Sequence, residues 1–447
     1  MNAFQIAYIP IGVPTFHLGS AQQQFEQSKE LLRSLSENVV VPENMLLSLD
    51  ELNNFLSEVH PTAIILQNIT FANAAYASDV LHCCNCPILL WTLREPVFDG
   101  GQLRLNSLTG AYSAANSFHA FGVKNFEYVF GAPEDAEVKK ELNAFIRAAE
   151  LRHKLSGLRM LAVGHTPQGF GFGRALDSEI LHHFGVHLET VEAHFLIEKA
   201  MSYSEEEVIP YLEQTAQCTC GLECISQCNQ INHARLYKAY WEYITENNIG
   251  TIATRCWPDF FTDFGTPVCT ILSMLNDHGI SAACEADIYG ALSMYIGQHL
   301  TGLPTFFGDP VSLDEAENTI TYWHCGTAAA SLAHPDTGAS IGVHPNRKIG
   351  PVMDFGCAPC KHVTIFRIGR KPDGSFRGFI ASGEVLDKPK QFSGTSIVVR
   401  TDENVKYLVY DSIKQGWEPH FVVAYGDIHR ELKILCNMLD LEICEYR

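Results

Sequence analysis

The chain has 447 residues, of which 46% are hydrophobic, so it can bury more than one core and we expect about three domains. Its 51 acidic and 31 basic residues give a formal net charge of -20, which disfavours nucleic acid or an anionic membrane as a partner. Since no apolar run approaches the ~20 residues of a membrane span and no secretion signal is apparent, we expect a cytoplasmic protein.

Residues 1–155 alternate short apolar runs with helical patterns. Strands are expected at FQIAYIPIG, VHPTAIILQNI, PILLWTL and NFEYVFG, and helices around residues 22–36, 73–81, 111–121 and 133–154. Apolar runs rich in Ile, Val and Leu between helices are typical of a parallel sheet covered on both faces. The first domain is therefore predicted to be α/β.

Residues 156–300 repeat this alternation. The strand LRMLAVG leads into the glycine-rich turn GHTPQGFG, and strands are again expected at GVHLETVE, IGTIATRCW and ISAACEAD. The turn lacks both the spacing of a dinucleotide fingerprint and the Lys-Ser/Thr of a P-loop, which favours a plain turn and argues against a nicotinamide dehydrogenase. Turns at the carboxyl ends of parallel strands nevertheless often line ligand crevices.

Residues 301–447 change to a β pattern. Strands are expected at NTITYWHCG, KHVTIFRIGR, GFIASGEVL, SIVVRT and HFVVAYGD, followed by a helix around residues 428–439 and the short strand LEICEYR. The predicted fold class is therefore α/β, with two doubly wound parallel-sheet domains followed by a mostly antiparallel β domain.

Fifteen cysteines occur in this long chain, many inside apolar segments, and we expect most of them to be buried free thiols. The run CTCGLECISQC could suggest zinc, but it lacks the paired C-x₂-C spacing of zinc knuckles. The CAPC segment lies in a β-rich region and not at the start of a helix, which disfavours a redox dithiol.

Two carboxylates stand at the ends of apolar runs, Glu285 in CEAD and Asp309 in FFGDP. Because an unpaired buried carboxylate is costly, two in one neighbourhood predict a divalent cation. His324 ends one predicted strand and His420 opens another in the same domain as Asp309. Carboxylates combined with imidazoles suit manganese, magnesium, cobalt or iron better than structural zinc.

Segments along almost the whole chain resemble the L-fucose isomerase and L-arabinose isomerase superfamily: LREP, LRLNSLTGA, RCWPDF, CEADIYGALSMYIGQHLTG and PHFVVAYGDIHRELKILCNMLDLEI. The resemblance implies that Glu285, Asp309 and His420 bind the metal and that the two carboxylates act as acid and base. His324 matches a histidine of the arabinose isomerases, whereas fucose isomerases use three protein ligands. A homo-oligomer, trimer or hexamer, is also implied, with the active site at a subunit interface.

The implied reaction is a metal-dependent aldose-ketose isomerisation by proton transfer between C1 and C2 through a metal-stabilised enediolate, with Mn2+ as the expected ion. The substrate is either a neutral sugar of the fucose or arabinose type or a sulfo-sugar of the sulfoquinovose type. An inactive sugar-binding or regulatory protein on the same fold is the alternative, although such a protein is expected to lose one of the carboxylates.

An anionic sugar needs cationic side chains around it. The residues predicted to contact the substrate are Arg94, Arg104, Trp257 and Arg347, with Arg255 and Lys348 as further cationic candidates.

Overall fold

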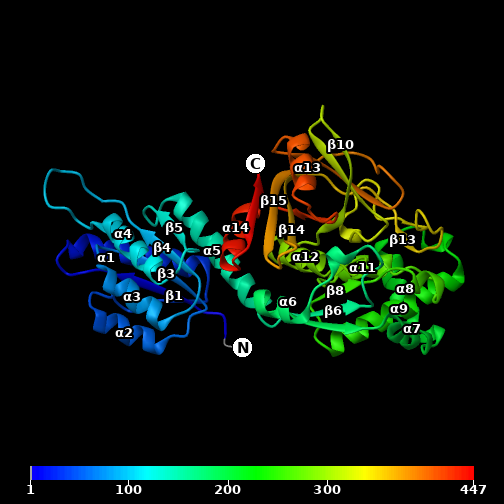
Figure 1. Ribbon diagram of the computed structural model, residues 1–447, viewed down its shortest axis with the longest axis horizontal. Helices are drawn as coiled ribbons and strands as arrows, with labels where there is room; N and C mark the ends of the chain where they lie inside the picture. Colours follow the sequence, from blue (N-terminus) through cyan, green and yellow to red (C-terminus); the bar gives the residue numbers. More distant parts are fainter. Residues whose placement is uncertain (1–2) are drawn as a thin grey trace. The chain divides into compact units, whose positions relative to one another are not determined.

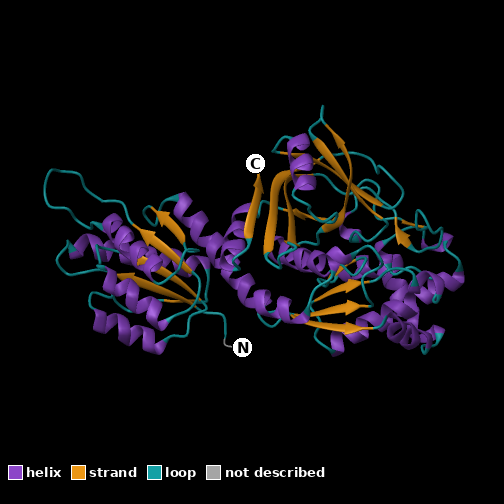
Figure 2. Cartoon of the chain, in the orientation of Figure 1, coloured by secondary structure: helices purple, strands orange, loops and turns teal. Residues whose placement is uncertain are grey.

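The structure is a computed structural model that describes residues 3–447 (Figures 1 and 2). The chain forms two compact units. The first comprises Met1–Lys154 and Ile434–Asp440, and the second comprises Leu155–Lys433 and Leu441–Arg447. The division into three domains, 1–155, 156–300 and 301–447, stays a prediction.

The first unit contains a five-stranded parallel sheet in the order β2-β1-β3-β4-β5. Its strands are β1 (Ile6–Ile11), β2 (Val39–Val40), β3 (Ala63–Asn68), β4 (Ile88–Thr92) and β5 (Glu127–Phe130). Strands β1, β3 and β4 are buried at every position, which explains their continuous apolar runs. The predicted α/β character of this region is confirmed.

Five helices accompany this sheet: α1 (Leu18–Leu35), α2 (Leu49–Glu58), α3 (Ala74–Cys83), α4 (Ser107–Ala120) and α5 (Ala136–Leu155). Helix α2 was not among the predicted elements. Its sequence does carry a start signal, because Ser48 and Glu51 form a capping box at its N-terminus.

The second unit begins with a four-stranded parallel sheet in the order β7-β6-β8-β9. The strands are β6 (Arg159–Val163), β7 (His187–Val191), β8 (Thr251–Thr254) and β9 (Ser281–Ala283). The order reverses between β6 and β8, and a crevice is expected outside the carboxyl ends of strands at such a point. Gly164 and Arg255 follow these two strands and lie against each other.

Helix α12 (Ile288–Thr301) joins the parallel sheet to the β region, since it contacts β8 and β9 on one side and β14 and β17 on the other. Nearly all of its side chains are buried, so it has no polar face and no amphipathic period for sequence analysis to detect. The other helices of this part are α6 (Asp177–Phe184), α7 (Ala193–Met201), α8 (Glu205–Cys218), α9 (Gln227–Glu246), α10 (Asp259–Thr262) and α11 (Cys269–Asp277).

The remainder of the second unit is an antiparallel barrel. Its ring runs β14-β17-β10-β11-β16-β15 and closes because β14 also pairs with β15. The strands are β10 (Phe306–Asp314), β11 (Thr319–His324), β14 (Cys360–Arg370), β15 (Phe376–Val385), β16 (Thr395–Thr401) and β17 (Phe421–Tyr425), with β18 (Glu442–Tyr446) parallel to β15. The short strands β12 (Ile341–Gly342) and β13 (Val352–Met353) pair separately, and helices α13 (Val405–Lys414) and α14 (His429–Met438) complete the chain. The predicted fold class is confirmed.

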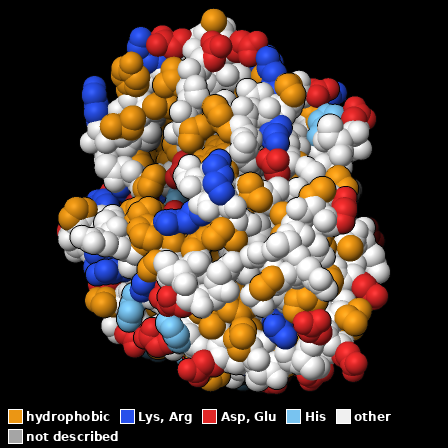
Figure 3. Space-filling view, turned by 90° about the vertical axis from the view of Figure 1, so that its right-hand side faces the viewer, with side chains coloured by type: hydrophobic (Ala, Val, Ile, Leu, Met, Phe, Trp, Pro, Cys, Tyr) orange, Lys and Arg blue, Asp and Glu red, His pale blue; other side chains and the backbone are white. Residues whose placement is uncertain are grey.

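Acidic side chains are spread over the face shown in Figure 3, in keeping with the net charge of -20. Among the helices of residues 3–447, none combines the length and the apolar character needed to cross a membrane.

Candidate metal centre

Glu285 lies in a tight turn between β9 and α12. Both Glu285 and Ala286 have left-handed backbones, with φ of 59° and 54°, which costs a non-glycine residue on the order of 1–3 kcal/mol. The surroundings hold this turn in place: the N–H of Ala286 donates to the carbonyl of Thr254 at the end of β8, and Gly173 packs so closely that a Cβ there would lie 2.9 Å from Cα of Asp287. The glycine-rich loop therefore has a structural purpose beyond a plain turn, since it supports the turn that carries Glu285.

The barrel supplies the other predicted ligands through neighbouring strands. Strand β10 runs between β11 and β17, and Gly308 pairs with Phe421, which brings Asp309 next to His420. Asp309 also pairs with Trp323, the residue before His324. The strand pairing therefore gathers three side chains that are far apart in sequence.

Glu285, His324 and His420 form a compact cluster in which one potential ligand atom of each lies within 4.8 Å of the other two. Oε2 of Glu285 is 3.0 Å from Nε2 of His420. Asp309 lies at the edge of this cluster, with its Oδ1 3.4 Å from the same nitrogen. All four residues predicted as metal ligands are thus neighbours, and both imidazoles are buried.

The charges of these groups depend on one another. Burial opposes protonation of His420, but hydrogen bonds to Asp287 and Glu285 outweigh it and raise its pKa to about 9. For Glu285, burial is likewise outweighed, here by the hydrogen bond from His420, so that its pKa is lowered. Burial raises the pKa of Asp309, against the lowering effect of His420 and His324.

The donor set fits a divalent cation. Two carboxylates and two imidazoles offer only oxygen and nitrogen, donors that are able to hold a divalent metal ion.

Asp287 and Arg367 are functional neighbours that the sequence analysis missed. Asp287 is fully buried and its Oδ2 accepts from Nδ1 of His420 at 2.9 Å, which directs Nε2 of this imidazole toward Glu285. Nη1 of Arg367 donates both to Asp287 at 2.7 Å and to the backbone carbonyl of His420 at 3.0 Å. Asp287 is the second carboxylate of the CEAD segment, two residues after Glu285, and this position was the available signal.

Aromatic rings extend from the cluster to a predicted substrate residue. The ring of Phe172 packs 5.4 Å from that of His420, Phe170 packs against both Phe172 and Trp257, and the guanidinium of Arg347 lies 5.4 Å from the centre of the Trp257 ring. Trp257 and Arg347 are therefore in contact. We call the rings of Phe172, Phe170 and Trp257 the aromatic wall, and Arg347 lies at its end. Within residues 3–447, no carboxylate forms an ion pair with Arg347.

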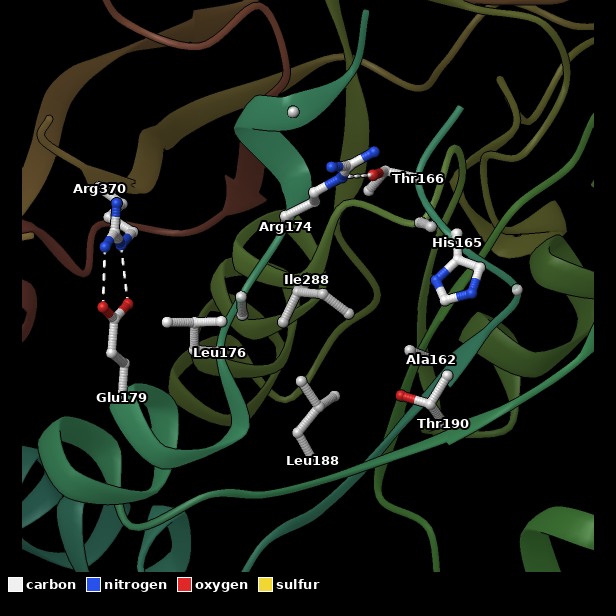
Figure 4. A pocket seen from close by; sticks show the side chains of 14 residues that line it. Ala162, His165, Thr166, Arg174, Leu176, Glu179, Leu188, Thr190, Ile288 and Arg370 are labelled. Atoms are coloured by element: carbon white, nitrogen blue, oxygen red, sulfur yellow. Dashed lines mark hydrogen bonds and ion pairs between the residues drawn. The ribbon is translucent and has the colours of Figure 1, made fainter. Parts of the chain in front are cut away.

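A cavity of about 360 Å³ opens beside the turn, at the carboxyl ends of β6 and β7 (Figure 4). The glycine-rich loop lines it together with Ala286. Its two guanidiniums are already engaged, because Arg370 forms a two-bond ion pair with Glu179 and Arg174 donates to the hydroxyl of Thr166. The four clustered ligands are not part of its lining.

The other arginines proposed for the substrate have local partners. Arg94 and Arg104 belong to the first unit, where Arg94 pairs with Asp135 and Arg104 with Asp99, each at 3.0 Å. Arg255, in the second unit, pairs with Asp259 at 2.9 Å. Substrate contacts by Arg94 and Arg104 stay predictions.

The expectation that most cysteines are buried was wrong. All fifteen are free, but only six are buried, and the four of the CTCGLECISQC run are exposed. These four lie at a helix end and in loops, where hydrophobic neighbours in the sequence do not produce burial. The three near Glu285, namely Cys256, Cys269 and Cys284, are buried as expected.

Comparisons with known proteins extend over the whole chain. Residues 355–447 match the family model of the L-fucose isomerase C-terminal domain. The chain is 63% identical over 442 residues to a sulfoquinovose isomerase of Clostridium sp. (strain MSTE9), covering 99% of both proteins. It is also 36% identical to a sulfoquinovose isomerase of Priestia aryabhattai, covering 100% of both, and 34% identical to one of Alkalicoccus urumqiensis, covering 98% of this chain and 99% of the relative.

These similarities confirm the resemblance to the fucose isomerases and the expected class of enzyme, and they disfavour the inactive alternative. The chain belongs to the sulfoquinovose isomerase family of sugar aldose-ketose isomerases, whose C-terminal domain is of the L-fucose isomerase type.

Proposed function

We propose that this protein interconverts sulfoquinovose, an aldose with a sulfonate at C6, and its ketose. The observation that carries the proposal is the 63% identity, over 99% of both chains, to a sulfoquinovose isomerase. The buried cluster around His420 supports it independently, because aldose-ketose isomerisation needs acid-base groups next to a site of positive charge.

Glu285, Asp309, His420 and His324 are proposed to hold a divalent ion, with Mn2+ the first choice. When bound, the ion supplies Lewis-acid stabilisation of the negative charge that develops on O1 and O2 of the open-chain sugar. The proposal therefore assigns all four clustered side chains to one centre.

Glu285 and Asp309 are proposed to move the proton between C1 and C2, one as base and the other as acid. Their carboxylates lie 3.0 and 3.4 Å from the same nitrogen of His420, one from the turn after β9 and one from strand β10, so the site holds two separate proton-transfer groups. Asp287 acts one step further out, by fixing the ring of His420.

The sulfonate is proposed to bind Arg347. A permanent negative charge at the far end of the sugar calls for a guanidinium that is not already neutralised. Arg347 meets this condition, because it rests on Trp257 and Phe261 without a carboxylate partner in the described residues, whereas Arg255 and Arg370 are ion-paired. The aromatic wall between Arg347 and His420 offers the surface along which the sugar extends.

The homo-oligomer, trimer or hexamer, is also part of the proposal. It rests on the resemblance to the fucose isomerases, as does the contribution of Arg94 or Arg104 from a neighbouring subunit. The measured mass of the assembly in solution tests it directly.

The test of the reaction is an assay of the metal-loaded protein on sulfoquinovose, glucose, L-fucose and L-arabinose, with ketose formation followed by NMR. We expect turnover of the sulfonated sugar to exceed that of the neutral sugars. Excess chelator should remove the activity, and Mn2+ should restore it better than Ca2+ because the site contains imidazole. Full activity in chelator would contradict the metal mechanism, and tight binding of sulfoquinovose without turnover would point to a binding protein.

A further inference from the structure

Four buried cysteines lie in the core of the second unit: Cys256, Cys269, Cys284 and Cys325. Cys284 immediately precedes Glu285, and Cys325 immediately follows His324, so this thiol cluster adjoins the carboxylate-imidazole centre. The isomerisation proposed above uses none of its sulfur atoms.

The spacing of the sulfurs is that of metal ligands and not of a disulfide. Sγ of Cys269 and Sγ of Cys325 are 4.0 Å apart. In a tetrahedral zinc site with Zn–S bonds of about 2.3 Å, two ligating sulfurs lie roughly 3.8 Å apart, whereas a disulfide brings them to about 2.05 Å. Little movement is therefore needed for these two thiols to bind one ion.

A buried imidazole completes the group. One ring nitrogen of His344 and the sulfurs of Cys269 and Cys325 all lie within 4.8 Å of one another. Nδ1 of His344 accepts two long hydrogen bonds, at 3.3 Å each, from the backbone N–H groups of Asn346 and Arg347. Ligation through Nε2 would place the proton on Nδ1 and give up these bonds, which are weak at that length.

Cys284 lies within 4.8 Å of Cys325 and of His324, so it borders this group and is the candidate for the fourth ligand. Metal binding deprotonates the ligating thiols, and the ion then balances the charge of the buried thiolates, which would be costly without it.

We propose that Cys269, Cys325 and His344, with Cys284 in the fourth position, form a second metal site that binds one Zn2+ ion. Thiolate ligands select zinc strongly over manganese, whereas the oxygen and nitrogen donors around His420 also accept harder ions such as Mn2+. The ion would be structural, because all four side chains are buried, and it would tie the start of α11 to the end of β11 and to the segment between β12 and β13. That segment carries the exposed Val343 and Arg347 and offers the route by which the ion enters.

Cobalt binding distinguishes the two sites. Reduced, metal-free protein is titrated with Co2+, which gives an intense near-ultraviolet charge-transfer absorption only when thiolates bind it. We expect one equivalent to produce this absorption in the wild type and equally in Glu285→Gln, whose isomerase activity is lost. The double variant Cys269→Ser/Cys325→Ser should lose the absorption, and the matched control Cys357→Ser/Cys436→Ser, which removes two other buried thiols, should keep it.

X-ray absorption at the zinc edge gives a readout that needs no variant. Wild-type protein loaded with one equivalent of Zn2+ should show sulfur scatterers at about 2.3 Å. Three results would overturn the proposal: no charge-transfer absorption in reduced wild type, its retention in Cys269→Ser/Cys325→Ser, or a zinc shell of oxygen and nitrogen alone. Loss of isomerase activity in Glu285→Gln with the absorption intact separates this site from the catalytic one.

Discussion

The two parallel sheets have the same strand order at their start, yet their carboxyl ends differ in chemistry. In the first unit, the charged groups after β4 are satisfied locally: Glu95 accepts backbone N–H groups of Arg104 and Leu105, and Arg94 pairs with Asp135. In the second unit, Glu285 follows β9 and faces His420 of the barrel. Equal topology thus produces a carboxylate-imidazole cluster only where a second element supplies complementary side chains.

The comparison identifies the side chains that the barrel contributes to the site. Strand pairing around β10 places Asp309, His324 and His420 at one point, and helix α12 connects that point to the sheet through the Glu285 turn. The parallel sheet alone provides one carboxylate. The centre is therefore a product of the packing of sheet against barrel.

The largest expected effect comes from Glu285→Gln, which neutralises the carboxylate that lies 3.0 Å from Nε2 of His420. Turnover should fall about 10³-fold or more, since a proton-transfer group and a ligand are lost together, while the fold is kept because the two side chains have the same shape. Steady-state assays with circular dichroism check this result. Glu315→Gln, at an exposed ion pair of the same unit, serves as the control and should be unchanged. Wild-type turnover in Glu285→Gln would refute the assignment.

Asp287→Asn tests whether His420 needs its buried hydrogen-bond partner. We expect a 10–100-fold loss of metal affinity, because the carboxylate no longer orients His420. The free energy of unfolding should also fall by about 1.5–3 kcal/mol, since Arg367 loses its nearest carboxylate and keeps only Glu418, at 3.8 Å, and the carbonyl of His420. Glu179→Gln, which breaks a half-exposed ion pair with Arg370, should cost below about 1 kcal/mol. Calorimetry and denaturant titration measure both quantities, and equal effects in the two variants would contradict a special role for Asp287.

Arg347→Ala tests the cationic end of the aromatic wall. The KM for sulfoquinovose should rise about 10-fold or more, because a charge-assisted contact to the sulfonate is lost. The KM for a neutral aldose should stay constant, and so should both values in the control Arg400→Ala, whose guanidinium pairs with Glu384. A parallel rise for neutral and sulfonated sugars would place the sulfonate elsewhere.

Arg94→Ala probes the first sheet. If this side chain contacts substrate from a neighbouring subunit, the KM should rise about threefold, the scale of one modest hydrogen bond. The free energy of unfolding should change by less than about 1 kcal/mol, as its pair with Asp135 is largely exposed. An unchanged KM would limit the first unit to a structural role.

The fold was largely predictable because its signals are local. Buried parallel strands appear as continuous apolar runs, and barrel strands such as β14 are bounded by turns that contain glycine and proline. Helix α12 escaped prediction because it is buried on all sides, and most cysteines were wrongly expected to be buried because apolar neighbours in the sequence, as around Cys83 and Cys84, do not ensure burial.

The sequence by itself determined the strand-helix alternation, the change to a β domain and the four candidate ligands Glu285, Asp309, His324 and His420. Tertiary structure alone decided that these ligands meet, that Asp287 and Arg367 support them, and that the thiols of Cys269 and Cys325 lie 4.0 Å apart. The physical reason is the range of the interactions. Propensity and hydrophobic period act over a few residues, whereas the contact of Asp287 with His420 joins positions that only the packing of sheet, helix and barrel brings together.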